Sequence, residues 1–561
     1  MNFELIDYII FILYCLVIIG IGLWVSRGEK GKEKTSEDYF LASKSLPWWA
    51  IGASLIAANI SAEQFIGMSG SGFAMGLSIA SYEFMAAITL IIVGKYFIPI
   101  FIEKGLYTIP DFIEKRYSKN LKSILAIFWL LLFVFVNLAS VFFLGAKALD
   151  TILGTGNGDY ILISCIGLAV FAAAYSLYGG LSAVAWTDVF QVVLLVVGGI
   201  ITTLIAIEHL TPEGGILNGF SHLLEKAPER FSMILEKNEI LIPKKGGSKD
   251  AYLDLPGLSV LIGGMWVANL YYWGFNQYII QRTFAAKSVK ESQRGIVFAG
   301  FMKLIIPFIV VVPGLIAYVM YTQTDGTMVI DGVKEVFGNK DGSLNNDNAY
   351  PWLISQFVPT GLKGLVVAAL TAAIVSSVAS MLNSIATIFT MDIYNEYINK
   401  KPTEKSLVSI GRISAFIALM ISVPVGLKLG GIDQMFNHIQ KWTGVVSPGI
   451  LMIFMLGLFW KKTTNKAAII GVISSVIIGI ILKAIEPSLK NTWFEPWMHQ
   501  MEFLILFSFI IILILSYLEN KGKDDVKGID FTAKLFKTDK VFNIASIVII
   551  VLTTILYIVF W

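Results

Sequence analysis

Hydrophobic residues occur in this chain in long runs, and short polar segments separate them. Each run has about twenty residues or more, the length that an α-helix needs to cross the hydrocarbon core of a bilayer. The pattern predicts an all-α polytopic membrane protein with about fourteen transmembrane helices. The predicted spans are 7–26, 46–73, 77–101, 121–150, 159–178, 183–207, 257–281, 293–322, 362–395, 405–427, 438–460, 465–484, 499–518 and 541–561.

The second predicted span carries polar residues where a lipid-facing helix would be apolar. Its centre reads Ala-Ala-Asn-Ile-Ser-Ala-Glu-Gln over residues 57–64, and Gly67, Gly70 and Gly72 follow. Lipid cannot form hydrogen bonds with stray polar groups, so this stretch must face protein or a water-filled cavity. The glycines favour local unwinding, which would free backbone groups to bind an ion or a solute. Broken helices near the bilayer midplane are typical of secondary transporters, so the stretch indicates transport.

The seventh predicted span has a similar centre, where Asn269, Asn276 and Gln277 lie close to Gly274. The two interrupted spans are five spans apart, and each leads a group of five. An inverted five-plus-five repeat predicts this arrangement, with the binding site between the two breaks. We therefore expect one transporter domain over residues 1–561. Its predicted parts are an extra N-terminal helix and loop (7–45), a first inverted repeat (46–207), a loop (208–256), a second inverted repeat (257–460) and three C-terminal helices (461–561).

Composition and charge support this class and orient the chain. Only 15% of the 561 residues are charged, against about 25% in soluble proteins. The two cysteines and four scattered histidines indicate neither a disulfide framework nor a catalytic metal site. Lys and Arg are concentrated after the first, third, seventh, ninth, eleventh and thirteenth spans. By the positive-inside rule those loops are cytoplasmic, so both termini and the longer loops 208–256 and 323–350 lie outside the cytoplasm.

Two opposite charges lie inside apolar spans. Glu83 is in the third span, and Lys303 is about ten residues into the eighth. Glu83 could reach for lipid headgroups, or the two could form a purely structural ion pair. Alternatively they share a polar cavity, which suits a neutral polyol because hydroxyls donate to carboxylates and accept from ammonium groups. The residues alone leave these interpretations open.

Other polar and aromatic residues also allow two interpretations. Amides within spans commonly join helices, although their clustering at the two breaks favours a site. Tyr271, Tyr272 and Trp273 are either an interfacial belt or a platform for the apolar face of a sugar ring. Gln440, at the start of the eleventh span, is a helix-end polar residue or a ligand donor, and its position favours the former.

A possible cation site lies in the ninth span. Ser376 and Ser377 could bond back to their own helix, as serines in helices often do. With carbonyl groups freed by a neighbouring break, however, paired hydroxyls can hold Na⁺ without a fixed negative charge. Asp188, near the inner end of the sixth span, either guides the cation or caps that helix.

Several stretches resemble the sodium/solute symporter family, and within it the bacterial sodium/galactose branch. The most specific are residues 53–70, 178–188, 269–281 and 457–464. The resemblance runs from near residue 10 to the C-terminus and weakens in 208–250 and 323–350. It implies a LeuT-like fold with one helix before the repeats and three after them. It also implies Na⁺-driven sugar uptake by alternating access in the inner (plasma) membrane of a bacterium.

The resemblance further implies roles for individual residues. The sugar ligands would be Gln64, Glu83, Asn269, Lys303 and Gln440, with Asn137 nearby. The residues that close the cavity would be Tyr272 as a gate under the ring, Tyr82 and Trp273. The sodium ligands would be the carbonyls of Ala57, Ile60 and Ala373 and the hydroxyls of Ser376 and Ser377. Asp188 would lie on the route of the ion to the cytoplasm.

One position departs from the sodium/galactose pattern, because Ala86 stands where those proteins place a serine against the sugar. A lost hydrogen bond changes affinity by about 0.5–1.5 kcal/mol, so the choice between galactose, glucose and other sugars is open. Alternatives with the same fold are a carrier of myo-inositol, a sialic acid or an amino acid, and a non-transporting sugar sensor. Lys303 opposed by Glu83 favours a neutral solute. An enzyme is disfavoured, since the spans contain neither paired His nor Cys/His sets, and phosphate-binding loops are missing.

The expected partners are therefore a small neutral sugar, Na⁺ and the lipid bilayer. No nucleic-acid partner is expected. The sequence leaves the oligomeric state and the number of Na⁺ ions per solute open.

Overall fold

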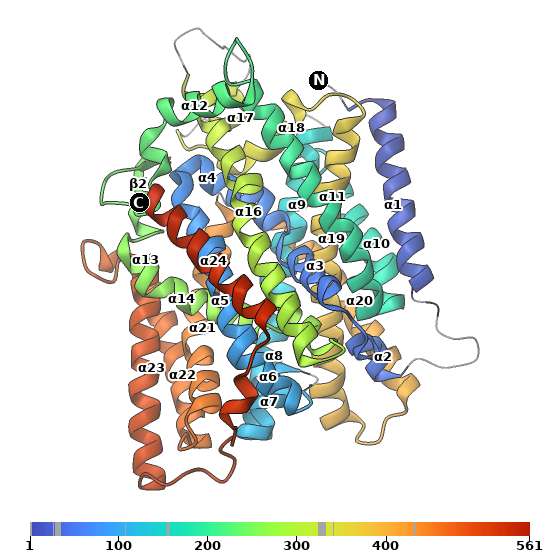
Figure 1. Ribbon diagram of the computed structural model, residues 1–561, viewed down its shortest axis with the longest axis vertical. Helices are drawn as coiled ribbons and strands as arrows, with labels where there is room; N and C mark the ends of the chain where they lie inside the picture. The colour runs from blue at the N-terminus through green and yellow to red at the C-terminus, as the bar shows by residue number, and fades with distance from the viewer. Residues whose placement is uncertain are drawn as a thin grey trace.

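The computed structural model describes residues 3–25, 27, 35–106, 108–153, 158–323, 333–339, 342–430 and 434–561. Parts of the predicted loops 27–45 and 323–350 lie outside these residues. Within the described part the chain is almost entirely helical. One antiparallel hairpin, β1 (Leu241–Lys244) and β2 (Gly247–Asp250), interrupts the helices. Figure 1 shows a bundle with α12, α17 and α18 at one end and α2 and α7 at the other.

Ten uninterrupted helices form most of the bundle. They are α1 (Leu5–Val25), α10 (Ile161–Gly179), α11 (Leu181–Glu208), α16 (Val289–Thr322), α19 (Leu362–Ile388), α20 (Glu404–Leu427), α21 (Met435–Phe459), α22 (Asn465–Ala484), α23 (Trp497–Asn520) and α24 (Lys540–Val559). α16 runs through the middle of the view in Figure 1, and α24 lies diagonally across the front.

Other spans are built from several consecutive pieces. The first group is α3 (Trp48–Asn59), a π-helical turn η2 (Glu63–Met68), α4 (Ser69–Met75), η3 (Gly76–Ala80), α5 (Ser81–Ile92), η4 (Val93–Phe97) and α6 (Ile98–Glu103). The second is α8 (Lys119–Leu132), a π-helical turn η5 (Phe133–Leu138) and α9 (Ala139–Leu153). The third is α13 (Leu258–Ile262), α14 (Gly264–Phe275) and α15 (Gln277–Phe284).

Short elements occupy the connections. They are α2 (Ser36–Leu41), η1 (Ala42–Lys44), α7 (Ile109–Arg116), α12 (Ile216–Lys226), η6 (Pro228–Phe231), η7 (Ala251–Leu253), α17 (Val333–Phe337), η8 (Asn346–Asn348), α18 (Ala349–Phe357), η10 (Glu486–Leu489) and η11 (Ala533–Phe536). The π-helical segment η9 (Phe389–Ile398) instead continues α19 within the same span.

The described residues contain twelve or thirteen candidate spans, against about fourteen predicted. Twelve helical segments of the described residues are long and apolar enough to cross a membrane, and the pair Ala251–Ile262 and Gly264–Phe275, bent by 77°, adds a thirteenth. The remaining predicted span, 46–73, is broken, and its first half, α3, has only 12 residues. The prediction of an all-α polytopic membrane protein is confirmed.

Both predicted helix breaks are present. α3 ends at Asn59, and Ile60 has extended backbone angles (φ −80°, ψ 102°). α14 ends at Phe275, and Asn276 is likewise extended (φ −87°, ψ 119°). α16 packs against α3, α4 and α5, and α14 packs against α5 and α21. Asn59 and Asn276, the residues at the two breaks, line one buried space.

The short connection between α10 and α11 depends on one glycine. Gly180 has a φ of +67°, and a Cβ atom there would lie 2.3 Å from the carbonyl oxygen of Tyr39. Only glycine adopts this left-handed conformation without strain and allows so close an approach. The connection can therefore be short enough to join two full spans.

Candidate solute cavity and ion site

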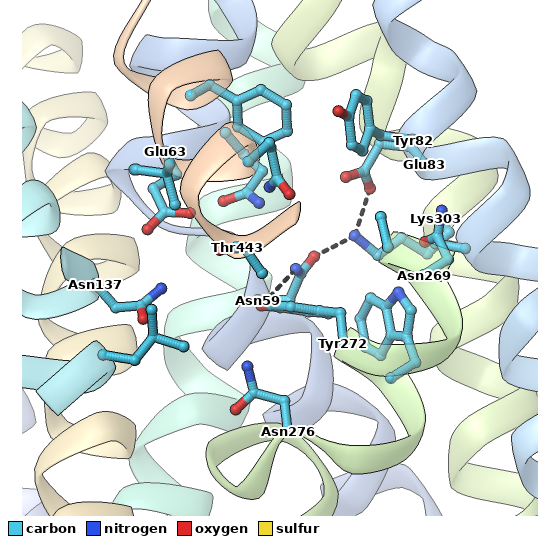
Figure 2. Close-up of a pocket in the computed structure, with 18 residues that line it drawn as sticks. Asn59, Glu63, Tyr82, Glu83, Asn137, Asn269, Tyr272, Asn276, Lys303 and Thr443 are labelled. Atoms are coloured by element: carbon cyan, nitrogen blue, oxygen red, sulfur yellow. Dashed lines mark hydrogen bonds and ion pairs between the residues drawn. The ribbon is translucent and has the colours of Figure 1, made fainter. Parts of the chain in front are cut away.

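A small cavity lies between the two helix breaks (Figure 2). It encloses about 50 Å³ of space for water-sized molecules. All nine residues predicted to bind or enclose the solute line it: Gln64, Tyr82, Glu83, Asn137, Asn269, Tyr272, Trp273, Lys303 and Gln440. The remaining lining residues are Asn59, Glu63, Ala86, Leu132, Ala268, Asn276, Phe436, Ile439 and Thr443. The structure thus brings together residues that are up to 376 positions apart, from Gln64 to Gln440.

The electrostatic centre of the cavity is Lys303, which has no exposed surface. Its ammonium donates hydrogen bonds to Glu83 Oε2 and Asn59 Oδ1 and lies 5.0 Å from the centre of the Trp273 ring. Asn59 in turn donates to the Tyr272 hydroxyl at 3.0 Å, and Figure 2 shows these contacts as one continuous chain. A buried ammonium is costly unless charged and polar groups surround it, and here a carboxylate, an amide and an aromatic face do so.

Several polar atoms around the cavity have no hydrogen-bond partner among the described residues. They are the Tyr82 hydroxyl, Glu63 Oε1, Asn137 Oδ1 and Asn276 Oδ1. Figure 2 shows Glu63 and Asn137 on the side of the cavity opposite Glu83 and Lys303. Buried polar atoms in proteins are nearly always paired, so a group of unpaired ones marks a place for water or a polar ligand.

Nearby backbone and hydroxyl groups hold two amides of the cavity, those of Gln64 and Asn269, in place. Gln64 Oε1 accepts from the Ser61 backbone N–H at 3.0 Å and from the Ser61 hydroxyl at 3.2 Å. Asn269 Nδ2 donates to the Met265 carbonyl at 3.2 Å. These bonds use the carbonyl oxygen of Gln64 and the NH₂ group of Asn269. The two amides offer opposite hydrogen-bonding functions, which suits a ligand with several hydroxyls.

Aromatic pairs close the cavity at two places. Tyr82 and Phe436 meet edge to face with ring centres 5.0 Å apart. The hydroxyls of Tyr272 and Tyr278 are 2.6 Å apart, and their rings are 5.8 Å apart. Tyr272 was predicted as a gate, whereas the roles of Phe436 and Tyr278 were not predicted. Phe436 precedes Gln440 by four residues, so helical spacing could have identified it.

Three further cavity residues were not assigned to the solute from the sequence, although their polar character within a span could have identified them. Asn59 and Asn276 were recognised as polar break residues but not assigned to the solute. Glu63 is the carboxylate next to Gln64 in the first break, and it lines the cavity with one unpaired oxygen. Its charge in the middle of a span was itself the signal.

All five predicted sodium residues are fully buried: Ala57, Ile60, Ala373, Ser376 and Ser377. The Ser377 hydroxyl donates to the Ala58 carbonyl at 2.8 Å and lies 3.5 Å from the Ala57 carbonyl. It therefore links α19 to the end of α3, where the helix break frees carbonyl groups. Hydroxyl and carbonyl oxygens in this arrangement are suitable ligands for a small hard cation. The assignment of these residues to Na⁺ stays a prediction.

The neighbouring Ser376 has a different partner, since its hydroxyl donates to Asp188 Oδ1 at 2.5 Å. Asp188 Oδ2 accepts from the Ser54 hydroxyl at 2.5 Å and lies 3.5 Å from the Arg282 guanidinium. Arg282 also donates to Ser54, to Ser380 and to the carbonyl of Tyr278. The alternative of a helix cap at Asp188 was wrong, because α11 begins at Leu181 and Asp188 lies within it. Its place on an ion path stays a prediction.

Known proteins resemble this chain over its whole length. The model of the sodium:solute symporter family matches residues 39–475. The chain is 56% identical over 558 residues to the sodium/glucose cotransporter of Vibrio parahaemolyticus, covering 100% of this chain and 98% of that protein. It is 32% identical over 508 residues to sodium/myo-inositol cotransporter 2 of Oryctolagus cuniculus, covering 88% of this chain and 71% of that protein.

The fold is also that of a solved transporter structure. A substrate-bound, outward-open Na⁺-coupled sialic acid symporter matches with a TM-score of 0.74 at 22% identity, covering 92% of this chain and 98% of that one. At this identity the likeness shows the fold alone. It confirms the predicted LeuT-like architecture.

Proposed function

Because this chain belongs to the sodium:solute symporter family, we propose that it takes up a monosaccharide of the galactose/glucose type together with Na⁺ by alternating access. Na⁺ is the coupling ion of the family and of the named relatives. These proteins are transporters, so the prediction that the chain is not an enzyme is confirmed. The proposal adds the solute class and the residues that bind it.

The observation that carries the proposal is the convergence of the nine predicted residues on one cavity. The cavity offers amide, hydroxyl and carboxylate groups together with an aromatic ring, that of Trp273. Such a set matches a sugar, which has hydroxyls around its edge and apolar C–H faces. Gln64, Glu83, Asn269, Lys303 and Gln440 would bind the hydroxyls.

The charges of the cavity favour a neutral solute. Lys303 is the one cationic side chain among the described residues that line it, and Glu83 already pairs with it. An acidic solute such as a sialic acid would need a further cation to offset its desolvated carboxylate. The two relatives are named as cotransporters of glucose and of myo-inositol, which are both neutral polyols. The higher identity to the glucose cotransporter, 56% against 32%, supports a hexose.

For the membrane arrangement, we propose the plasma membrane of a bacterium with both termini outside the cytoplasm. The chain is a multi-pass membrane protein, and the relative of 56% identity is bacterial. Figure 1 draws both chain ends in the half of the molecule that holds α12 and the β-hairpin. The Lys- and Arg-rich loops support the assignment of the opposite half to the cytoplasm. The division of the chain into parts at residues 45, 207, 256 and 460 stays a prediction.

Uptake into proteoliposomes tests the function. Radiolabelled glucose, galactose and myo-inositol are offered with an inward Na⁺ gradient or with K⁺ in place of Na⁺. We expect accumulation of glucose or galactose with Na⁺ only. Equal uptake in both salts would refute the coupling to Na⁺. Preferential uptake of myo-inositol would show that the solute is myo-inositol and not a hexose. Binding of a sugar without uptake would support the sensor alternative.

A further inference from the structure

The loop 208–256 carries a buried carboxylate for which the proposed transport cycle has no role so far. The hairpin β1–β2 and the turn η7 lead to Asp254, which is 1% exposed. Its side chain accepts a hydrogen bond from Lys249 of the same loop and lies 3.1 Å from the ammonium of Lys441 in α21. Asn437, also in α21, lies 3.4 Å from it. One carboxylate thus joins the loop to the first two turns of α21.

Those turns also carry cavity residues. Phe436 and Gln440 line the cavity, and they are the immediate neighbours of Asn437 and Lys441 in the sequence. Phe436 closes the cavity against Tyr82. The contacts of Asp254 therefore fix the part of α21 that forms one wall of the cavity and supplies a predicted sugar ligand.

Two further contacts hold the start of α21 and the end of α4 in place. Asp347 of η8 accepts from the backbone N–H of Met435, the first residue of α21, at 3.3 Å. A Cβ atom at Gly70 of α4 would lie 2.4 Å from Asp347 Oδ1, so the glycine makes this approach possible. Arg230 of η6 donates to the carbonyl of Ala74 at 2.5 Å, at the end of α4. The loops thus hold the ends of both α4 and α21.

Asp254 differs from these contacts because it has two cationic partners, one from each of the two elements that it joins. Lys249 belongs to the loop, whereas Lys441 belongs to α21. If α21 moves away with Lys441, Lys249 remains beside the carboxylate, so separation leaves no unpaired buried charge at Asp254. Lys441 keeps an acidic neighbour too, Glu486, which pairs with Lys483 at 2.6 Å.

We propose that Asp254 and Lys441 form a releasable latch that positions Phe436 and Gln440 when closed and frees the first turns of α21 for solute passage when open. Both are positioning residues, since neither lines the cavity. The role of the latch in transport rests on the proposed function, whereas its opening is a property of the protein without solute.

Lys249 makes the latch sensitive to alkaline pH. Burial lowers the pKa of Lys249 to about 8, with Asp254 opposing and Lys441 reinforcing the shift. Two other charged groups interact with Lys249. Lys244 also lowers the pKa of Lys249, and the charge of Lys249 lowers the pKa of Glu486. Above pH 8 Lys249 is neutral, and release of Lys441 then leaves Asp254 without a cation unless a proton is taken up. Opening that takes up one proton becomes about tenfold less favourable for each pH unit above the pKa.

Hydrogen exchange of the full chain in sugar-free nanodiscs tests the latch directly. Lys441→Met breaks the closed state, so backbone amides of residues 435–442 should exchange at least tenfold faster. Lys249→Met removes the cation that stabilises the open state, so the same amides should exchange more slowly. Lys245→Met, on an exposed residue of the same hairpin, should leave the exchange unchanged. Acceleration in both Lys441→Met and Lys249→Met, or in neither, would overturn the latch in favour of a purely structural ion pair.

Stopped-flow binding of galactose and glucose tests the link to transport. In the wild type, association and dissociation rates should fall together by about fivefold between pH 8 and pH 9 while Kd stays constant, because half of Lys249 is already neutral at pH 8. Lys249→Arg should abolish this fall, because a guanidinium keeps its charge. A fall that persists in Lys249→Arg would refute the pH dependence. If neither sugar binds while the exchange results hold, the latch stands and the proposed solute fails.

Discussion

Two buried pairs of opposite charge lie in the same helix bundle, and they differ in their surroundings. Arg282 and Asp188 are 1% and 0% exposed, and serine hydroxyls and a backbone carbonyl complete their contacts. Lys303 and Glu83 are as deeply buried, but they border a cavity that also holds four unpaired polar atoms. The first pair is saturated, so it joins helices. Lys303 and Glu83 can form hydrogen bonds with a solute in place of some of their present ones. Unpaired polar atoms beside such a pair distinguish a binding site from a structural contact.

The largest expected effect is on the unsaturated pair. Lys303→Met should reduce sugar uptake to background, because the solute loses a donor and Glu83 loses its cation. The variant should also unfold more easily, by about 3–5 kcal/mol, since an unpaired buried carboxylate remains. Uptake and the midpoint of thermal unfolding measure the two effects.

A second variant separates binding from stability. Adding Glu83→Gln to Lys303→Met removes the unpaired charge, so thermal stability should recover while uptake stays at background. Lys104→Met, on an exposed lysine, is the control for loss of a cation. Recovery of uptake in the double variant would mean that the pair is structural and that the comparison fails.

For the pair Arg282–Asp188, we expect a loss of stability without a loss of sugar binding. Arg282→Met leaves Asp188 without its cation and should lower stability by about 3–5 kcal/mol. The protein that remains folded should bind sugar with unchanged affinity, measured by equilibrium binding at low temperature. Adding Asp188→Asn should restore most of the stability. A sugar affinity that falls more than tenfold in Arg282→Met would connect this pair to the solute cavity.

A smaller effect is expected at Ser377, which follows Ser376 in the chain and bonds to the Ala58 carbonyl at the end of α3. Ser377→Ala removes one oxygen from the proposed sodium site, at a cost of about 1 kcal/mol. The Na⁺ concentration for half-maximal uptake should therefore rise about fivefold, as measured in uptake titrations. Ser384→Ala, two helical turns further along α19, is the matched control, since that hydroxyl bonds to Gln281. Unchanged Na⁺ dependence in Ser377→Ala would exclude this residue from the site.

The smallest expected effect is at Ala86, which lines the cavity. Ala86→Ser adds a hydroxyl facing the solute, and a water can already take its place. We expect galactose affinity to rise by about 0.5 kcal/mol, roughly twofold, with little change for glucose. Competition between the two sugars in the uptake assay measures the ratio. An unchanged ratio would show that this position does not select between them.

Much of this arrangement could be predicted from the sequence, because lipid imposes strong rules. Apolar runs gave the spans, and polar residues inside them marked both breaks, at Asn59 and Asn276. The resemblance supplied the nine cavity residues, and the structure brings all nine together. The direction in which a single hydroxyl points could not be predicted. The Ser376 hydroxyl, which was expected to bind sodium, donates to Asp188 in the structure. A rotamer is set by partners far away in the sequence.

The loops and the π-helical turns were also beyond the sequence pattern. The strands of the hairpin at 241–250 have four residues each, and β2 reads Gly-Ser-Lys-Asp, with no apolar alternation to reveal it. The π-helical turns η2 and η5 differ from α-helix only in the register of backbone hydrogen bonds. That register depends on packing against neighbouring helices, which a local pattern does not record.

The π-helical turns make the cavity sensitive to residue count. Gln64 lies in η2 and Asn137 in η5, and each wide turn accommodates one residue more than an α-helical turn of the same rise. Successive residues of an α-helix are rotated by about 100° around its axis. Deleting one residue within either turn would convert it to an α-helical turn. The flanking helices would keep their places, but the residues inside the turn would shift by one position and carry the polar group away from the solute. The side of the helix on which Gln64 or Asn137 lies is thus set by the number of residues in its turn, a constraint that no substitution at another position can replace.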